Sequence, residues 1–200
     1  MRGLQKDNTA TFHFLEGDLE SDPGPGIAGV HDPPFYSYYK FPLSLSDNDS
    51  SLLEAYDLLH DTLLDEGPFD GILGFSHGGT LAAGFLIRHA KLHPGQSPLF
   101  RCAIFINSLP PFRMDPGDAQ CPVIDDGLDG YIKIPTVSIA GAKDGLFDYS
   151  LMLHRLCHGK NSCFVVHSSG HDVPADAKNV AVMATAIRKL AGQVVRTYGW

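Results

Sequence analysis

The stretch FDGILGFSHGGTLAA occupies residues 69–83 and carries the strongest structural signal in the sequence. A short apolar run ends in Gly-Phe-Ser-His-Gly and is followed at once by small and apolar residues at helical spacing. This pattern predicts a strand, a sharp turn and a helix with Ser76 at the apex, the arrangement called a nucleophile elbow. Gly74 and Gly78 suit such a turn, because its apex residue adopts a positive φ and its backbones approach too closely for side chains. We therefore expect Ser76 to stand exposed above a sheet.

The composition is typical of a single domain that spans residues 1–200, and it argues against several classes of partner. With 44% hydrophobic residues in 200 positions, the chain can bury a substantial core. The net charge of -8 comes from scattered acidic residues, which argues against nucleic acid or an anionic membrane as a partner. No apolar run is long enough to span a membrane, and the first residues lack the apolar core of a signal peptide. We expect a cytoplasmic protein.

Strand-like and helix-like segments alternate along the whole chain. Besides the elbow, the β-rich or apolar runs at 11–15, 102–107, 135–141 and 163–167 predict strands. Helices are expected near 1–8, after a cap at Ser46 or Asp47, and over 78–92, 150–157 and 175–195. This alternation predicts an α/β fold with a mostly parallel sheet flanked by helices on both faces.

Three strand exits offer the side chains of a hydrolytic triad. Reactive groups gather at the carboxyl ends of parallel strands, and these exits contain Ser76, Asp144 and His171. Their order of nucleophile, acid and histidine is that of the α/β-hydrolases. Serine needs a neutral imidazole to take its proton, and the imidazole needs a carboxylate to fix its tautomer. Asp148 is the nearest rival for the acid.

A long loop precedes the elbow and offers a second group of candidates. Residues 22–42 are rich in proline and glycine, and loops of that length in compact domains are usually functional. Its aromatic residues could form one wall of an apolar pocket, with a plain packing role equally open. The pocket candidates are Phe35, Tyr36, Tyr38 and Tyr39.

No cofactor or metal ion is expected. Gly24, Gly26 and Gly29 spell G-x-G-x-x-G, but prolines surround them and no strand precedes them as a dinucleotide site requires. The pairs His89 with His93 and His154 with His158 lack the glutamate of a zinc-binding helix, which favours exposed helix histidines. The four cysteines have no paired spacing, and Cys102 and Cys163 lie in apolar runs that suit reduced core thiols.

Together these motifs resemble the fungal FSH-type serine hydrolases. The resemblance rests on residues 74–79, on the exits at 141–144 and 170–174, on Phe-Leu-Glu-Gly at 14–17 and on Tyr-Ser-Tyr-Tyr at 36–39. Members of that family are small α/β-hydrolases that include esterases and the thioesterases accompanying polyketide synthases. The resemblance implies hydrolysis of a carboxylic ester or acyl thioester, with an acyl carrier protein as a possible partner and Ser76, Asp144 and His171 as the triad.

The chain also departs from the family pattern at its amino terminus. Family members open with a strand and a loop that supplies one oxyanion-hole N–H, and this sequence shows neither. The His77 N–H can still donate, since it follows the nucleophile. We expect Met1 to be a mis-assigned or truncated start. The rival hypothesis is a catalytically silent α/β-hydrolase-like protein that only binds a ligand or partner.

Overall fold

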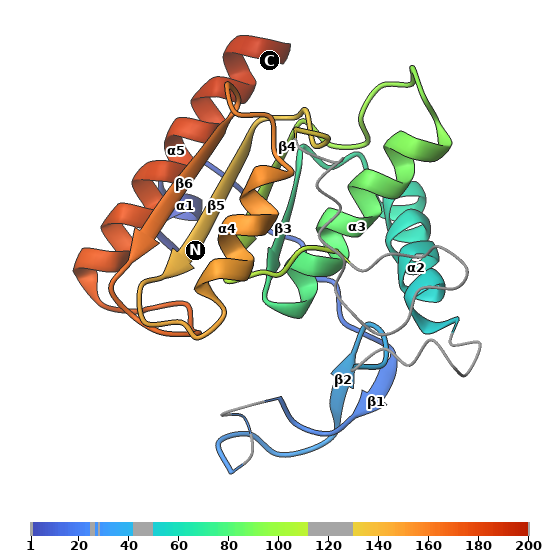
Figure 1. Ribbon diagram of the computed structural model, residues 1–200, viewed down its shortest axis with the longest axis vertical. Coiled ribbons are helices and arrows are strands. Elements are labelled where there is room, and N and C mark those ends of the chain that lie inside the picture. Colours follow the sequence, from blue (N-terminus) through green and yellow to red (C-terminus); the bar gives the residue numbers. More distant parts are fainter. Residues whose placement is uncertain (1, 25–26, 28, 42–49, 112–129, 200) are drawn as a thin grey trace. The chain divides into compact units, whose positions relative to one another are not determined.

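The computed structural model describes residues 2–24, 27, 29–41, 50–111 and 130–199 (Figure 1). The chain separates into two compact units. The larger unit contains residues 1–11, 69–114 and 122–200, and the smaller contains residues 12–68 and 115–121. The expectation that residues 1–200 make a single domain stays a prediction.

The larger unit is built on a four-stranded parallel sheet. Its strands are β3 (Gly71–Phe75), β4 (Cys102–Ile106), β5 (Thr136–Gly141) and β6 (Ser162–His167), in the order β3-β4-β5-β6. The register pairs Phe75 with Ile106, Ile106 with Ile139, and Gly141 with His167. The carboxyl ends of all four strands therefore meet at one end of the sheet, as the sequence predicts.

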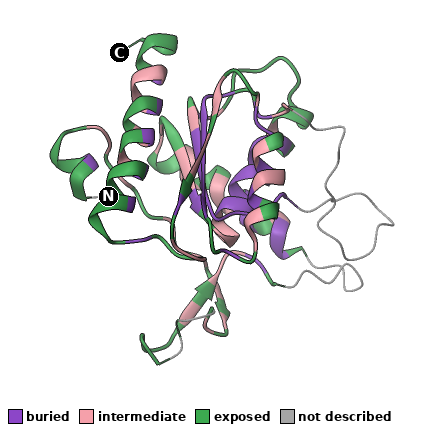
Figure 2. Cartoon of the chain, turned by 60° about the vertical axis from the view of Figure 1, so that its left-hand side comes forward, coloured by how far each residue is buried: buried purple, intermediate pink, exposed green. Residues whose placement is uncertain are grey.

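Helices cover both faces of this sheet. Apolar residues of β4 and β5 pack against α5 (Ala177–Tyr198), which begins after the capping residue Asp176. The alternate residues face α3 (His77–Leu92) and α4 (Phe147–Arg155). His154 Nδ1 of α4 lies 3.2 Å from Ser138 Oγ of β5, so the expectation of an exposed helix histidine is wrong for His154, which is half-buried. Buried residues accordingly concentrate on β4, β5 and the helix faces against them (Figure 2). The α5-side core consists of Ile104, Ile106, Val137, Ile139, Met183, Ala186 and Leu190.

The first residues form a short helix that packs on α5. This helix, α1 (Arg2–Lys6), buries Leu4. An ion pair joins Arg188 Nη2 to Asp7 Oδ2, just past the end of α1. The predicted helix end near residues 1–8 is thus confirmed.

The smaller unit consists of a helix and a two-stranded hairpin. Its helix, α2 (Ser51–Glu66), begins after Ser50; the caps proposed at Ser46 and Asp47 lie outside the described residues. Strands β1 (Leu19–Ser21) and β2 (Phe35–Ser37) pair antiparallel within the stretch predicted to be a loop. The predicted strand at 11–15 is wrong, since these residues have no strand hydrogen bonding and Phe14 is 72% exposed. A β-rich run without a described partner strand gains little from its propensity.

The cysteine expectation is only partly correct. Cys157 is buried and Cys102 is half-buried, but Cys163 is exposed. Cys163 lies near the start of β6, which among the described strands has β5 as its only neighbour. Among the described residues, no helix is both long and apolar enough to cross a membrane.

Candidate active site

Ser76 stands at the apex of a strained turn between β3 and α3. Its φ of 49° and ψ of -118° lie where few residues other than glycine are found. Its N–H donates to the Ile106 carbonyl at 2.8 Å, and its own carbonyl accepts from the N–H of Thr80 at 3.1 Å. Hydrogen bonds to the neighbouring strand and to the first turn of the helix therefore fix this turn. The turn predicted at Ser76 is confirmed, although the residue is half-buried and not exposed as expected.

Two glycines let the strand and the helix approach each other at this turn. A Cβ on Gly74 would lie 2.4 Å from the Cα of Gly79, and one on Gly79 would lie 1.9 Å from Ser108 Oγ. No real side chain tolerates such distances, so both positions require glycine. Gly74 confirms the close approach expected from the sequence, and Gly79 adds a second contact that the motif did not single out.

The His171 imidazole lies between Ser76 and Asp144. Its Nε2 is 2.8 Å from Ser76 Oγ, and its Nδ1 is 2.8 Å from Asp144 Oδ2. Only the tautomer with the proton on Nδ1 satisfies both contacts, because the carboxylate accepts at Nδ1 and the serine hydroxyl donates to Nε2. The Phe75 ring lies against the imidazole, with the ring centroids 5.3 Å apart. The structure thus brings together the three side chains predicted from the strand exits.

Asp144 is buried and its carboxylate is fully engaged. Its side chain is 1% exposed, whereas that of His171 is 34% exposed. While Oδ2 contacts His171, Oδ1 accepts from the Leu146 N–H at 2.8 Å. A buried carboxylate is stable only when its oxygens are hydrogen-bonded. The rival acid, Asp148, lies exposed in the first turn of α4.

His77 begins α3 directly after Ser76. The N–H groups in the first turn of a helix have no partner within the helix and lie at its positive end. A backbone N–H at this position suits an oxyanion beside Ser76. The His77 side chain is different, because burial lowers the pKa of its imidazole to about 4.

The four aromatic candidates belong to the smaller unit and differ in their surroundings. Phe35 and Tyr36 lie in β2, where Tyr36 is 47% exposed. The Tyr38 hydroxyl donates to the Leu15 carbonyl at 2.9 Å. Tyr39 is fully buried, and burial raises the pKa of its hydroxyl. Tyr38 and Tyr39 thus pack within their own unit, and the pocket role stays a prediction.

Two buried polar residues near the triad were missed by the sequence reasoning. Asn107 follows β4, and its amide hydrogen-bonds to the strand exits that carry Asp144 and His171. His167 ends β6, and its Nδ1 accepts from the Ser169 N–H at 3.3 Å. Asn107 did carry a signal, since it is the first polar residue after an apolar strand.

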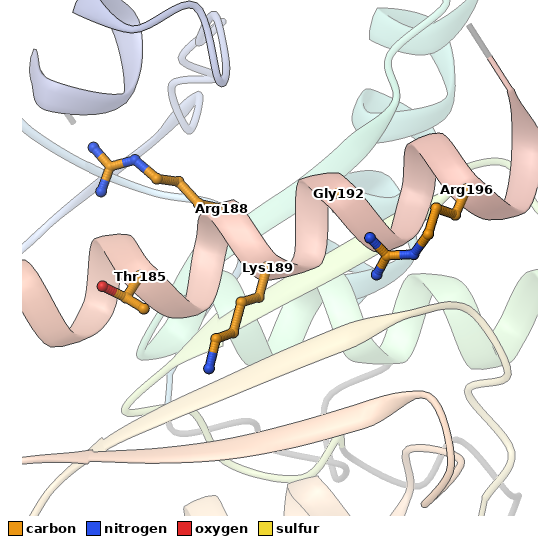
Figure 3. Close-up of a pocket in the computed structure, with 5 residues that line it drawn as sticks. All are labelled: Thr185, Arg188, Lys189, Gly192 and Arg196. Carbon is orange, nitrogen blue, oxygen red and sulfur yellow. The ribbon is translucent and has the colours of Figure 1, made fainter.

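Figure 3 shows a different surface feature, a hollow of about 330 Å³ along α5. Long cationic side chains surround small residues there, and none of the triad residues lines it. Arg188, which lines it, also forms the ion pair with Asp7. The hollow is therefore lined by residues of one helix and lies apart from the triad. Its lining consists of Thr185, Arg188, Lys189, Gly192 and Arg196.

Comparisons with known sequences agree with this arrangement. The sequence model of the family described as "Serine hydrolase (FSH1)" matches residues 1–183. The chain is 41% identical over 196 residues to the hydrolase phiM of Talaromyces stipitatus, covering 94% of this chain and 77% of that protein. It is 30% identical over 197 residues to the esterase FPY3 of Fusarium mangiferae, covering 96% of this chain and 87% of that protein.

Solved structures show the same fold at low sequence identity. A carboxylesterase from Mesorhizobium loti aligns with a TM-score of 0.52 and 17% identity, over 85% of this chain and 71% of that chain. Acyl-protein thioesterase 2 from Zea mays aligns with a TM-score of 0.52 and 16% identity, over 80% of this chain and 74% of that chain. The α/β-hydrolase-like fold is thus confirmed. The chain belongs to the FSH1 family of serine hydrolases and is an enzyme of the esterase and hydrolase class.

Proposed function

We propose that the protein cleaves a carboxylic ester or an acyl thioester through an acyl-Ser76 intermediate. The observation that carries this proposal is the pair of 2.8 Å contacts from Ser76 Oγ to His171 Nε2 and from His171 Nδ1 to Asp144 Oδ2. This is the geometry in which a serine hydroxyl loses its proton to a neutral imidazole as it attacks a carbonyl.

The proposed reaction has two steps, acylation of Ser76 and hydrolysis of the acyl-enzyme. Ser76 Oγ bonds to the carbonyl carbon while its proton moves to His171 Nε2, and His171 then gives that proton to the departing alcohol or thiol. In the second step water attacks the acyl group, His171 takes the proton of the water, and the proton returns to Ser76 Oγ as the acid is released. Asp144 holds the Nδ1–H tautomer and stabilises the imidazolium in both steps.

Charge on the carbonyl oxygen develops beside the start of α3. The His77 N–H donates to this oxygen in the proposed mechanism, and the positive end of the helix adds a favourable field. Ser76, with its φ of 49°, directly precedes this N–H, as the nucleophile of an elbow does. One oxyanion donor is ordinarily worth about 100-fold to 1000-fold in kcat.

For the substrate, we propose an acyl chain carried as an ester or thioester in the cytoplasm. The similarity to the esterase FPY3 supports ester chemistry, and the resemblance to hydrolases accompanying polyketide synthases extends the proposal to a polyketide or fatty acyl chain on an acyl carrier protein.

The test is steady-state turnover of p-nitrophenyl butyrate beside a butyryl thioester of N-acetylcysteamine, a small mimic of a carrier arm. Wild type is expected to hydrolyse both, and the ratio of kcat/KM values reports the preferred leaving group. Ser76→Ala is expected to lose at least about 10⁴-fold in kcat. Ser162→Ala, at the opposite end of the sheet, serves as the matched control. A folded wild-type protein that hydrolyses neither substrate would support the rival role of a silent binding protein.

A further inference from the structure

Asn107 lies between the strand exits that carry Asp144 and His171. It is the first residue after β4, is fully buried and has a φ of 47°. Its N–H donates to the Ile139 carbonyl of β5 at 2.8 Å. A positive φ is uncommon outside glycine, and asparagine is among the few residues that tolerate it. The backbone leaves the strand direction here, and the side chain reaches the exits of the next two strands.

The Asn107 amide is hydrogen-bonded on both sides. Its Oδ1 accepts from the Gly141 N–H at 2.9 Å, where β5 ends three residues before Asp144. Its Nδ2 donates to the Asp172 carbonyl at 2.8 Å, next to His171, and more weakly to the Gly170 carbonyl at 3.5 Å. An amide offers one acceptor and two donors in one plane, and a carboxylate or hydroxyl cannot supply this combination without rearrangement. The residue type matches the task of joining two loops.

The two loops that Asn107 joins have no free space between them. A Cβ on Gly141 would lie 2.2 Å from the Gly170 carbonyl oxygen, so the two backbones are in direct contact. Beyond the strands, the Lys143 N–H still donates to the Ser169 carbonyl at 3.0 Å. A shift of either loop is therefore passed to the other, and the Asp144–His171 distance depends on this junction.

The segment around Asn107 also contacts the nucleophile turn. The Ile106 carbonyl accepts from the Ser76 N–H, and the Leu109 N–H donates to Thr80 Oγ1 at 3.2 Å in the first turn of α3. Ser150 Oγ of α4 donates to the Ser108 carbonyl at 3.1 Å, behind the acid loop. Residues 106–109 thus touch the segments that carry all three members of the triad.

We propose that Asn107 is a positioning residue that sets the alignment of Asp144 and His171 through its amide. The proposal rests on the proposed function, since the alignment matters for catalysis only if Ser76 is the nucleophile. Asn107 lies among protein groups and acts through the two loops, with no direct role toward substrate. A misalignment of about 1 Å in a reacting group ordinarily costs about 100-fold in rate, although the substrate is still bound.

Two variants separate the amide from the backbone. Asn107→Gly removes both side-chain contacts and tolerates the positive φ, whereas Asn107→Asp keeps the acceptor for Gly141 and loses the donor to Asp172. We expect Asn107→Gly to lower kcat for p-nitrophenyl butyrate about 10-fold to 100-fold with KM changed less than about twofold. Asn107→Asp is expected to fall in the same range. Both are compared at a temperature where circular dichroism shows them folded.

A double-mutant cycle with Asp144→Asn distinguishes positioning from general destabilisation. If Asn107 acts through Asp144, adding Asn107→Gly to Asp144→Asn should lower kcat by less than about threefold further. Thr136→Val is the matched control, because Thr136 is equally buried at the opposite end of β5 and donates to the Ile134 carbonyl at 2.9 Å. It is expected to lower the melting temperature and leave kcat within about twofold.

A readout without turnover keeps this proposal separate from the proposed function. Long-range ¹H–¹⁵N spectra of the His171 ring should show the Nδ1–H tautomer in wild type and Thr136→Val, and a mixture of tautomers in Asn107→Gly. An unchanged ring spectrum together with a kcat within about twofold of wild type in folded Asn107→Gly would overturn the positioning role. If wild type hydrolyses neither substrate while the tautomer still shifts in Asn107→Gly, the proposed function fails, whereas the alignment of His171 by the Asn107 amide is supported.

Discussion

The two ends of the same four-stranded sheet are built in different ways. At the carboxyl end, Ser76 and Asn107 directly follow neighbouring strands and both have a positive φ, and the side chains of Asn107 and Asp144 are almost fully buried. At the amino end, the hydroxyl of the buried Thr136 donates to a carbonyl only two residues away. Backbone strain and buried polar groups destabilise a fold unless the surrounding structure compensates for them. Their concentration at one end indicates that function shapes that end, whereas stability shapes the other.

The largest effect on turnover at the carboxyl end of the sheet is expected at the buried acid, Asp144. Asp144→Asn keeps the shape of the side chain but removes the charge that fixes the His171 tautomer, so kcat should fall about 10³-fold to 10⁴-fold. Asp148→Asn is the matched control, since Asp148 is exposed four residues later, and it should keep kcat within about twofold. Steady-state kinetics on p-nitrophenyl butyrate checks both variants. Equal losses in the two would contradict the assignment of the acid.

The largest effect on stability is expected where β3 and α3 approach each other beneath the elbow. In Gly74→Ala the added methyl meets the Gly79 backbone at 2.4 Å, so the turn must open, and the free energy of unfolding should fall by about 3 kcal/mol. Gly159→Ala meets nothing within 4 Å and should change it by less than about 1 kcal/mol. Urea unfolding followed by circular dichroism measures both. Equal stability of Gly74→Ala and Gly159→Ala would contradict the inference that the turn leaves no room for a methyl group at Gly74.

The half-buried His77 imidazole predicts how stability changes with pH. Because burial lowers the pKa of the folded imidazole from 6.5 to about 4, the unfolded chain takes up a proton below pH 6.5 that the folded chain does not. Lowering the pH from 6.5 to 4 should therefore reduce the free energy of unfolding, with a His77 contribution on the order of 3 kcal/mol. His77→Gln should flatten this part of the profile. His60→Gln, which alters an exposed side chain of α2, is the control for the substitution itself.

At the amino end of the sheet the expected effect is smaller. Thr136→Val removes one buried hydrogen bond, so the free energy of unfolding should fall by about 1 kcal/mol while turnover is kept. Parallel measurements of urea unfolding and of kcat test this prediction. A large loss of kcat in a folded Thr136→Val protein would remove the distinction between the two ends.

Features that depend on residues close together in the sequence could be predicted from the sequence. The four strands of the larger unit follow from apolar runs, and the elbow follows from a motif whose glycines and serine are adjacent. The hairpin of β1 and β2 was not predicted, and the strand expected at 11–15 does not form, because pairing depends on partners far along the chain. The role of Asn107 was hidden for the same reason, since its amide contacts lie 34 and 65 residues away.

The most direct test of the central claim is covalent labelling of the full chain by a fluorophosphonate probe, with the labelled peptide identified by mass spectrometry. An activated serine forms a stable adduct, whereas an ordinary turn serine does not. We predict one adduct on the peptide that contains Ser76, strongly slowed in Asp144→Asn and absent in Ser76→Ala. Equal labelling of wild type and Ser76→Ala would contradict the assignment of Ser76 as the nucleophile.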